Sequence, residues 1–223
     1  RRIKALGVPE KKIKLIRRGL SHWPKRESFD PIDPSQLELL SVGRLVEKKG
    51  YFHQLNLAAR LKAEGISFRL NIIGSGPLKN RLEKESVRKG LDKHVFFLGS
   101  RTERQTSEAF LQCDAFLFTG VIARNGDRDG IPNVIPEALA AGCLVLASDK
   151  AGASEAFVEG VSGFSLSPGD YDDWIALLKE FVENPQGFST IRKAAVKRAK
   201  EAFDVMRTVR SLRAEIEKVI QNQ

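Results

Sequence analysis

Residues 129–147 read DGIPNVIPEALAAGCLVLA, a stretch in which a turn, the start of a helix and a buried strand follow one another. Gly130 allows the chain to approach a ligand closely, and Asn133 is a residue type that caps helix N-termini. Pro136 then lies in the first turn, where its missing N–H group is tolerated. A helix therefore begins near Asn133, and its unpaired N–H groups and dipole favour an anion. We expect a phosphorylated ligand at residues 130–134.

Glu137 lies in the same helical turn as this expected anion site. A carboxylate repels a phosphate, so its more suitable partner is a neutral diol such as a ribose, whose hydroxyls donate to the carboxylate oxygens. The alternative is that Glu137 only complements the helix dipole. Spacing alone does not choose between these two interpretations.

Outward from this stretch, short apolar runs alternate with helical patterns. The runs that predict strands are residues 37–42, 68–73, 95–98, 115–118, 143–147 and 163–166. The segments that predict helices are residues 51–63, 78–89 and 103–111, the helix from Asn133, and the chain from Tyr171 to its end with turns near 184 and 203. This order predicts an α/β fold, a doubly wound, Rossmann-like parallel sheet with trailing C-terminal helices. Ligands of such sheets bind beyond the carboxyl ends of the strands.

The pattern divides the chain into three parts. Residues 1–34 are rich in proline and polar residues and are expected to be an interdomain or linker segment, with a short strand at 13–16. Residues 35–203 form the α/β domain. Residues 204–223 predict a charged, amphipathic helix that packs either back on this domain or on a neighbouring one.

Composition and charge restrict the partners. The 223 residues are 42% apolar and 29% charged, as in an ordinary globular protein, and no apolar run approaches a membrane span. The net charge of +9 fits nucleotide phosphates, nucleic acid or an acidic membrane face. Few aromatic residues accompany the cations, as base stacking would require, so we expect no nucleic acid partner. Most cations are expected to be solvated, and peripheral contact with an anionic membrane stays open.

The cysteines and histidines give no metal site. Cys113 and Cys143 each lie in an apolar context without metal-ligand spacing, which indicates buried thiols in a reducing compartment. The three histidines are scattered along the sequence. We therefore expect no metal, and a cytoplasmic location that includes the inner face of the membrane.

Cations and glycines follow the first two predicted strands. Gly43 and Arg44 end the first strand, and Lys49 follows before the next helix, so two cations lie where a ligand is expected to bind phosphate. The second strand ends in the loop Gly74-Ser75-Gly76-Pro77, which exposes its backbone. Neither loop is the three-glycine dinucleotide fingerprint or a Gly-Lys-Ser/Thr phosphate loop.

Taken together, these motifs resemble the C-terminal, donor-binding domain of GT-B retaining glycosyltransferases, a family that includes sucrose, glycogen and lipopolysaccharide mannosyl- or glucosyltransferases. The resemblance covers about residues 13–203. The matching motifs, in order, are Gly43-Arg44-Leu45 with Lys49-Gly50, Gly74-Ser75-Gly76-Pro77, Phe97-Leu98-Gly99, and Glu137-Ala138-Leu139-Ala140-Ala141-Gly142. Several motifs in the right order and spacing are far more specific than any one alone.

The resemblance implies roles for individual residues. Arg44 and Lys49 would hold the donor diphosphate and act in catalysis, and Glu137 would bind the ribose hydroxyls. Asp129 would contact the donor sugar as the first of the family's two acidic residues, usually Glu, and it follows an unusually long connection in which Asp127 contends for the same role. The other donor-binding positions implied are Gly43, Gly74, Ser75, Gly76, Phe97, Gly99, Gly130, Ile131, Pro132, Asn133 and Val134, with the backbone near Phe97 and Gly99 flanking the base.

The resemblance also implies an activity. The protein would transfer a sugar with retention from a nucleotide-diphosphate sugar to a glycan or lipid-linked acceptor, with no cofactor besides that substrate and no metal. The acceptor domain precedes this one in the family and is expected to lie outside this chain. The alternatives are a sugar-nucleotide epimerase of GT-B architecture, and a non-enzymatic module that binds nucleotide or nucleic acid.

Overall fold

The computed structural model describes residues 6–33 and 35–221, so residues 1–5 and 34 of the predicted linker and the last two of the predicted terminal helix lie outside it. The strands are β1 Leu37–Val42, β2 Phe68–Ile73, β3 Val95–Gly99, β4 Ala115–Phe118, β5 Leu144–Ser148 and β6 Phe164–Leu166. The helices are α2 Tyr51–Ala63, α3 Lys79–Arg88, α4 Glu103–Leu111, α5 Val134–Ala140, α6 Tyr171–Glu183, α7 Ser189–Phe203 and α8 Val205–Gln221, with 3-10 turns η1 Glu10–Lys12, η2 Glu47–Lys49, η3 Gly152–Glu155 and η4 Pro185–Phe188. The predicted strands and helices of the domain are confirmed, with bounds that shift by one or two residues.

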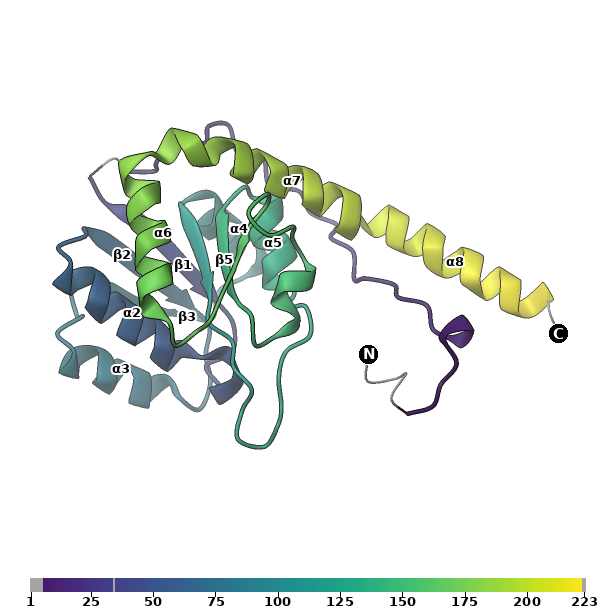
Figure 1. The fold of residues 1–223 in the computed structure, drawn as a ribbon, viewed down its shortest axis with the longest axis horizontal. Coiled ribbons are helices and arrows are strands. Elements are labelled where there is room, and N and C mark those ends of the chain that lie inside the picture. Colours follow the sequence, from purple (N-terminus) through teal and green to yellow (C-terminus); the bar gives the residue numbers. More distant parts are fainter. Residues whose placement is uncertain (1–5, 34, 222–223) are drawn as a thin grey trace.

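The six strands form one sheet in the order β3-β2-β1-β4-β5-β6, and every pair is parallel (Figure 1). The chain winds outward from β1 to β3, returns to the middle, and winds outward again from β4 to β6. This confirms the doubly wound sheet. The order of strands reverses between β1 and β4, and such a switch point leaves a crevice at the carboxyl ends of its two strands. The loops after β1 and β4 therefore meet there.

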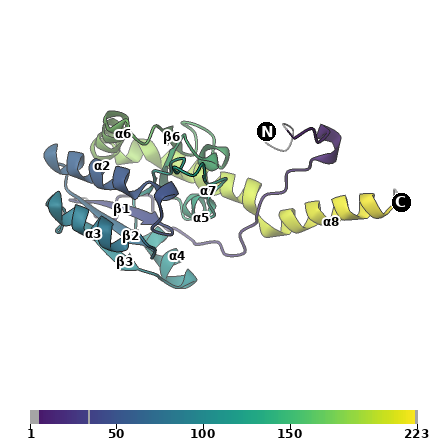
Figure 2. The same ribbon diagram turned by 90° about the horizontal axis from the view of Figure 1, so that it is seen from below.

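The N-terminal segment corrects one expectation. Residues 13–16, predicted as a strand, lie in extended chain outside the sheet, and Leu15 is 66% exposed. A strand needs a paired neighbour, and the sequence pattern here has none. The segment instead crosses the junction between α7 and α8, where Leu20 forms a parallel bridge with Asp204. In Figure 2 it leaves the domain on the same side as α8.

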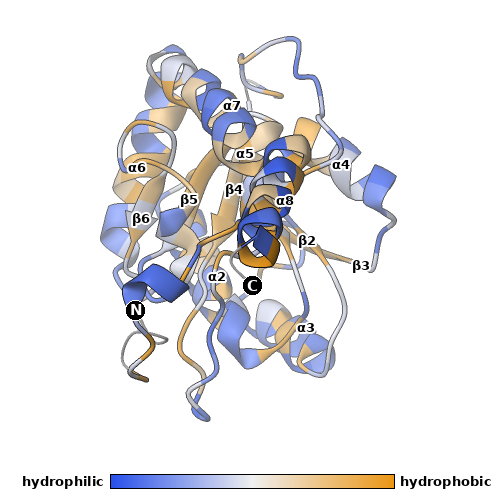
Figure 3. Ribbon diagram, turned by 90° about the vertical axis from the view of Figure 1, so that its right-hand side faces the viewer, coloured by the Kyte–Doolittle hydropathy of each residue, from blue (hydrophilic) through white to orange (hydrophobic). Residues whose placement is uncertain are grey.

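Helix α8 extends away from the domain rather than packing back on it (Figure 1). None of its described residues is buried, and an apolar stripe is exposed along it (Figure 3). The stripe consists of Met206, Val209, Leu212, Ile216 and Val219. Its contacts with the N-terminal segment include the hydrogen bond from Thr208 Oγ1 to Arg17 O and the ion pair between Lys14 and Glu215. No helix among residues 6–33 and 35–221 is long and apolar enough to cross a bilayer.

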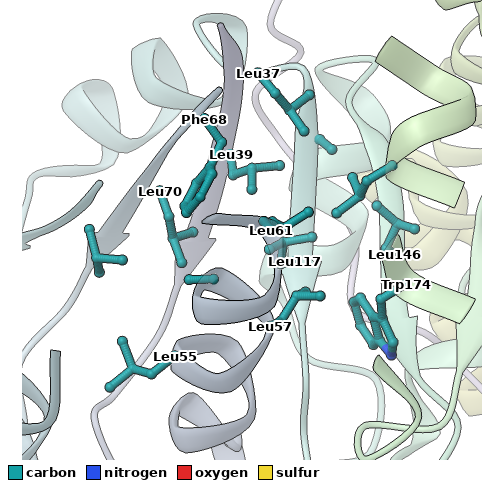
Figure 4. Packing of buried hydrophobic residues seen from close by; sticks show 14 of the residues in the cluster. Leu37, Leu39, Leu55, Leu57, Leu61, Phe68, Leu70, Leu117, Leu146 and Trp174 are labelled. Carbon is teal, nitrogen blue, oxygen red and sulfur yellow. The ribbon is translucent and has the colours of Figure 1, made fainter. Parts of the chain in front are cut away.

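The core lies on both faces of the sheet. Alternate residues of each strand point to opposite faces, so Leu39 and Leu117 belong to one cluster, and Leu40 and Phe116 to the other. The first cluster packs under α2 and α6, where Leu57, Leu61 and Trp174 meet the strand side chains (Figure 4). The second packs under α4, α5 and α7. Burial on both faces makes the central strands β4 and β5 almost continuous apolar runs.

The two cysteines lie next to each other at the amino ends of β4 and β5. Both are free and buried, as predicted, and their Sγ atoms are 3.2 Å apart. Each thiol donates to the carbonyl oxygen of Phe110. This edge of the sheet is opposite to the one that carries the predicted ligand-binding residues.

Candidate functional site

The loops after β1, β2 and β3 are joined through their backbones. Gly43 N donates to Ile73 O, and Gly74 N donates to Gly99 O. Gly74 has a φ of +144°, and a Cβ atom built there would lie 1.9 Å from the carbonyl oxygen of Gly43. Glycine is therefore required at this position, both for its conformation and for its contact. Gly43, Gly74 and Gly99 are thus brought together at the carboxyl edge, as the motifs predicted.

The remaining residues of these loops occupy the same edge. The backbone N of Leu45 donates to Ser75 O, and the Ser100 hydroxyl donates to the Ser75 hydroxyl. A Cβ at Gly76 would lie 2.6 Å from Leu45 O, so the loops pack tightly here too. The Phe97 side chain packs against the core and is not part of the exposed edge.

The two predicted cations differ in their surroundings. Arg44 is exposed and makes no ion pair with any residue that the structure describes. The Lys49 side chain lies over Gly43, where an added Cβ would be 3.5 Å from its Cε, and its Nζ is 5.3 Å from the centre of the Phe118 ring. Only 14% of the Lys49 side chain is exposed. Arg44 is therefore free to bind an incoming anion, while Lys49 is held at the crevice.

Lys49 is paired with Asp129. Its Nζ lies 2.8 Å from Asp129 Oδ2, and the other carboxylate oxygen lies 3.5 Å from Lys48 Nζ. Lys48 Nζ is also 3.0 Å from Asp127. Lys49 and Asp129 were predicted to belong to one site, and the structure places them in contact. Lys48 was missed, although a tandem lysine and two acids two residues apart were visible in the sequence.

The long loop between β4 and α5 is fixed to the turn η2 that carries these lysines. Val121 N donates to Lys48 O, and Arg124 N donates to Glu47 Oε1. Arg124 Nε also lies 3.7 Å from the same Glu47 oxygen. The unusual length of this connection therefore places Asp127 and Asp129 over η2.

The start of α5 corrects a second expectation. Asn133 occupies the N-cap position, but its backbone is helical and its side chain makes no capping hydrogen bond. The residue three positions on is Pro136, which has no N–H to cap, and the N–H of Ile135 already donates to Pro132 O. The N–H groups of Gly130, Ile131 and Asn133 have no acceptor among the described residues. Pro132 is buried and Val134 half-buried beside them. The predicted anion-binding amides are thus unpaired.

Glu137 faces a cavity of about 110 Å³. Its walls are α4, the start of α5 and the N-terminal segment, with lining residues that include Arg18, His22, Glu103, Ser107 and Asn133. Burial raises the pKa of the Glu137 carboxyl above its ordinary value, the Arg18 charge lowers this pKa, and Glu103 raises it. A carboxylate in a small, partly apolar cavity is suited to hydroxyl donors. The contribution of residues 18–24 to this cavity was not predicted.

Metal ligands are not gathered at this edge. Among residues 6–33 and 35–221, no group of three or more His, Cys, Asp or Glu side chains is arranged to hold a metal ion. The positive charge at the crevice comes from Arg44, Lys48 and Lys49.

The family model described as "Glycosyl transferases group 1" matches residues 25–202. The chain belongs to this family. Among its relatives, the amylovoran biosynthesis glycosyltransferase AmsK of Erwinia amylovora is 32% identical over 176 residues, which are 78% of this chain and 43% of AmsK. A Campylobacter jejuni protein, N-acetylgalactosamine-N,N'-diacetylbacillosaminyl-diphospho-undecaprenol 4-alpha-N-acetylgalactosaminyltransferase, is 30% identical over 173 residues, 77% of this chain and 44% of that protein. This glycosyl transferases group 1 chain thus spans less than half the length of these curated relatives.

Solved structures agree on the fold. The crystal structure of HepE from Anabaena in complex with UDP-glucose matches 97% of this chain and 60% of its own, with a TM-score of 0.77 and 22% identity. The lipopolysaccharide outer core galactosyltransferase WaaB in its apo form matches 97% of this chain and 58% of its own, with a TM-score of 0.76 and 21% identity. The sheet with its C-terminal helices therefore has the Rossmann-like architecture of GT-B glycosyltransferases.

Proposed function

We propose that this chain is the donor-binding half of a retaining hexosyltransferase. It binds a nucleotide-diphosphate sugar whose sugar passes to a glycan or lipid-linked acceptor in polysaccharide biosynthesis. The observation that carries this proposal is the placement of Lys49, Asp129 and Glu137 along one edge of the sheet, on the turn η2, the loop after β4 and the start of α5, beside the switch between β1 and β4. The names of its relatives favour transfer over epimerisation or a purely binding role.

The donor extends along this edge. Glu137 accepts hydrogen bonds from the ribose hydroxyls in its cavity, and the free N–H groups of Gly130 and Ile131 contact the diphosphate or the sugar. The backbone at Gly99, at the end of the edge strand β3, borders the base. HepE supports this assignment, because its solved complexes contain UDP and UDP-glucose.

The chemistry follows from the positions of the cations. As the bond between sugar and diphosphate breaks, negative charge grows on the departing phosphate. Arg44 and Lys49 interact more strongly with that charge than with the intact donor, so they lower the barrier. In a retaining reaction on one face of the sugar, the departing diphosphate takes the proton of the acceptor hydroxyl, and no nucleophile from the protein is required. Asp129 orients the donor sugar. Because the side chains supply the positive charge, we expect neither a metal nor a cofactor to be needed.

The charge distribution suggests where the protein works. Residues 1–34 contain ten Lys and Arg against four Asp and Glu, and residues 189–223 contain nine against four. The domain between them has a slight excess of acids, so the positive charge belongs to two segments that lie side by side. A basic surface of this kind attracts anionic lipid. We infer a cytoplasmic protein that works at the inner face of the membrane, near a lipid-linked acceptor.

The proposal is tested by a thermal-shift panel of UDP-, GDP- and ADP-sugars. A ligand that binds only the folded chain raises its melting temperature. We expect the nucleotide sugars of one base to do so when their concentration is well above their Kd. Because the chain spans less than half of its relatives, we expect donor binding with negligible sugar transfer. Absence of any shift across the panel would contradict the proposal, and so would appreciable transfer by the chain alone.

A further inference from the structure

The side chain of Lys48 bridges the two acids of the long loop. Its Nζ is 3.0 Å from Asp127 and 3.5 Å from Asp129 Oδ1, whereas Lys49 contacts Asp129 Oδ2. Two lysines and two carboxylates therefore form a neutral group at the crevice. The Asp129 carboxylate lies in the middle of this group, with Lys48 at one oxygen and Lys49 at the other.

The backbone fixes Lys48 relative to this loop. Its carbonyl oxygen accepts the Val121 N–H, and two residues later Gly50 adopts a φ of +69°. A Cβ at Gly50 would lie 1.8 Å from Thr119 O, so the end of η2 and the start of the long loop are in direct backbone contact. The Thr119 hydroxyl also donates to Gly50 O. The backbone of Lys48 is thus placed by packing, and its side chain needs only to reach the two acids.

A bound donor changes the balance of charge around Asp129. If Lys49 turns to the diphosphate, Asp129, whose side chain is only 14% exposed, loses the nearer of its two counter-ions. A diphosphate nearby also repels the carboxylate, and both effects favour displacement of the Asp129 side chain. Lys48 lies on the opposite carboxylate oxygen and is already held by Asp127. The Lys48 ammonium is therefore placed to remain with Asp129 when Lys49 turns to the phosphates.

We propose that Lys48 is a positioning residue that keeps the Asp129 carboxylate in place and aimed at the donor sugar while Lys49 binds the diphosphate, and that Asp127 holds Lys48 in place. This inference rests on the proposed function and adds to it a residue that determines how well the sugar is recognised. It divides the tandem lysines between two ligand groups. Lys49 serves the diphosphate, and Lys48 serves the sugar through Asp129.

The test compares a nucleoside diphosphate with its sugar. Calorimetry gives the Kd of UDP and UDP-glucose for the full chain, or of the GDP or ADP pair if the wild type binds that base. The ratio of the two Kd values measures the gain from the sugar. In Lys48→Met we expect this gain to fall at least about fivefold, while the Kd of the nucleoside diphosphate stays within about twofold. Lys48→Arg keeps the positive charge and should therefore restore the gain. If Lys48 only supported the structure, restoring its charge would not be expected to change how much the sugar adds to affinity.

Two further variants make the result specific. Asp127→Asn, which reaches the same group from the loop side, is expected to lose part of the gain. Lys179→Met is the matched control, because Lys179 pairs with Glu64 at the opposite edge of the sheet, beside the residues that precede β1 and β2, and its loss should change neither Kd. An unchanged gain in Lys48→Met overturns the proposal, and so does an equal loss for both ligands. If the wild type binds no nucleotide at all, the proposed function itself fails.

Discussion

The two sides of the crevice are built differently. The loops after β1, β2 and β3 are joined backbone to backbone through glycines, and the Gly74–Gly43 contact leaves no room for a side chain. The loop after β4 starts with a similar backbone contact, between Thr119 and Gly50, but its residues 124–129 are held over η2 by polar side chains, which include the ion pairs of Lys48 with Asp127 and Asp129. Close packing gives a fixed wall, whereas ion pairs exchange partners at small cost. In the proposed function, the wall borders the base and the diphosphate, and the ion-paired residues contact the sugar.

The largest effect is expected from Gly74→Ala, which disrupts the close backbone packing of the wall. The new Cβ meets the Gly43 carbonyl oxygen and a backbone φ that other residues rarely adopt. We expect a loss of about 2–5 kcal/mol in the free energy of unfolding, measured by urea denaturation. Gly126→Ala in the long loop is the control, because φ is also positive there but no atom lies within 4 Å. It should cost only about 1 kcal/mol. Equal losses in the two variants would show that packing does not distinguish the two sides.

Removing the Glu137 carboxylate, on the helix α5 that follows the loop after β4, tests the ribose assignment. Glu137→Ala should weaken nucleotide binding by about 1.5–3 kcal/mol, the usual contribution of hydrogen bonds to a charged group. Calorimetry with the nucleotide that stabilises the wild type measures this loss. A 2′-deoxynucleotide serves as the matched ligand, because it lacks one of the two ribose donors and should lose less. Unchanged affinity for the ribonucleotide would exclude the ribose assignment.

Arg44→Ala tests whether the wall binds the negative charge of the diphosphate. Arg44 is exposed and has no partner among the described residues, so its substitution should leave the fold intact. Affinity for the nucleoside diphosphate is expected to fall by up to about 2 kcal/mol, while affinity for the nucleoside stays the same, because only the diphosphate carries the charge that Arg44 binds. The two affinities are compared by calorimetry. A similar fall for both ligands would mean that Arg44 supports the structure instead.

The pH dependence of nucleotide binding follows from the raised pKa of Glu137. Burial is the main cause of this shift, so the ionised carboxylate is disfavoured in the folded chain and Glu137 contributes more stability as the pH falls through its folded pKa. Binding has the opposite dependence, because the ribose hydroxyls need an ionised acceptor. Affinity should be complete above the raised pKa and fall by up to about tenfold per pH unit below it. Glu137→Gln should remove this step from the pH profile, and a step that persists would belong to another group.

The smallest effect is expected on the ion-paired side. The Lys48–Asp127 pair is partly exposed, with 27% of one side chain and 53% of the other open to solvent. Asp127→Asn should therefore change the free energy of unfolding by less than about 1 kcal/mol, and added salt should reduce the difference further. Thermal denaturation at low and high salt measures this. A loss as large as that of Gly74→Ala would mean that the loop after β4 is as rigid as the wall.

The sequence predicted the domain well because its strands are buried on both faces. The central strands β4 and β5 are almost continuous apolar runs, and β1 and β2 keep enough apolar residues to be recognised. Residues 13–16 were predicted wrongly, because an apolar pattern does not reveal whether a partner strand exists. At Asn133 the residue type was right for a cap, but Pro136 removed the N–H that the cap would have bound.

The site was predictable only where it depends on backbone motifs. Gly43, Gly74 and Gly99 are legible because glycine is required by local conformation and close approach. The contact of Lys48 with Asp127 depends on how a loop of more than ten residues folds over η2, and charged residues in such loops have no periodic pattern. The approach of residues 18–24 to Glu137 is likewise a tertiary contact between distant segments. The roles of these residues in donor binding stay predictions.

The crossing of the N-terminal segment over the α7–α8 junction has a mechanical consequence. Leu20 N donates to Phe203 O, and Val205 N donates to Leu20 O, so the two segments are cross-linked on both sides of one residue. A Cβ at Gly19 would lie 2.3 Å from the Val205 Cα, which leaves them no play. A force on either segment is therefore expected to act on the other through this contact. Because residues 18–22 also line the Glu137 cavity, we expect a movement at the start of α8 to shift the wall of that cavity.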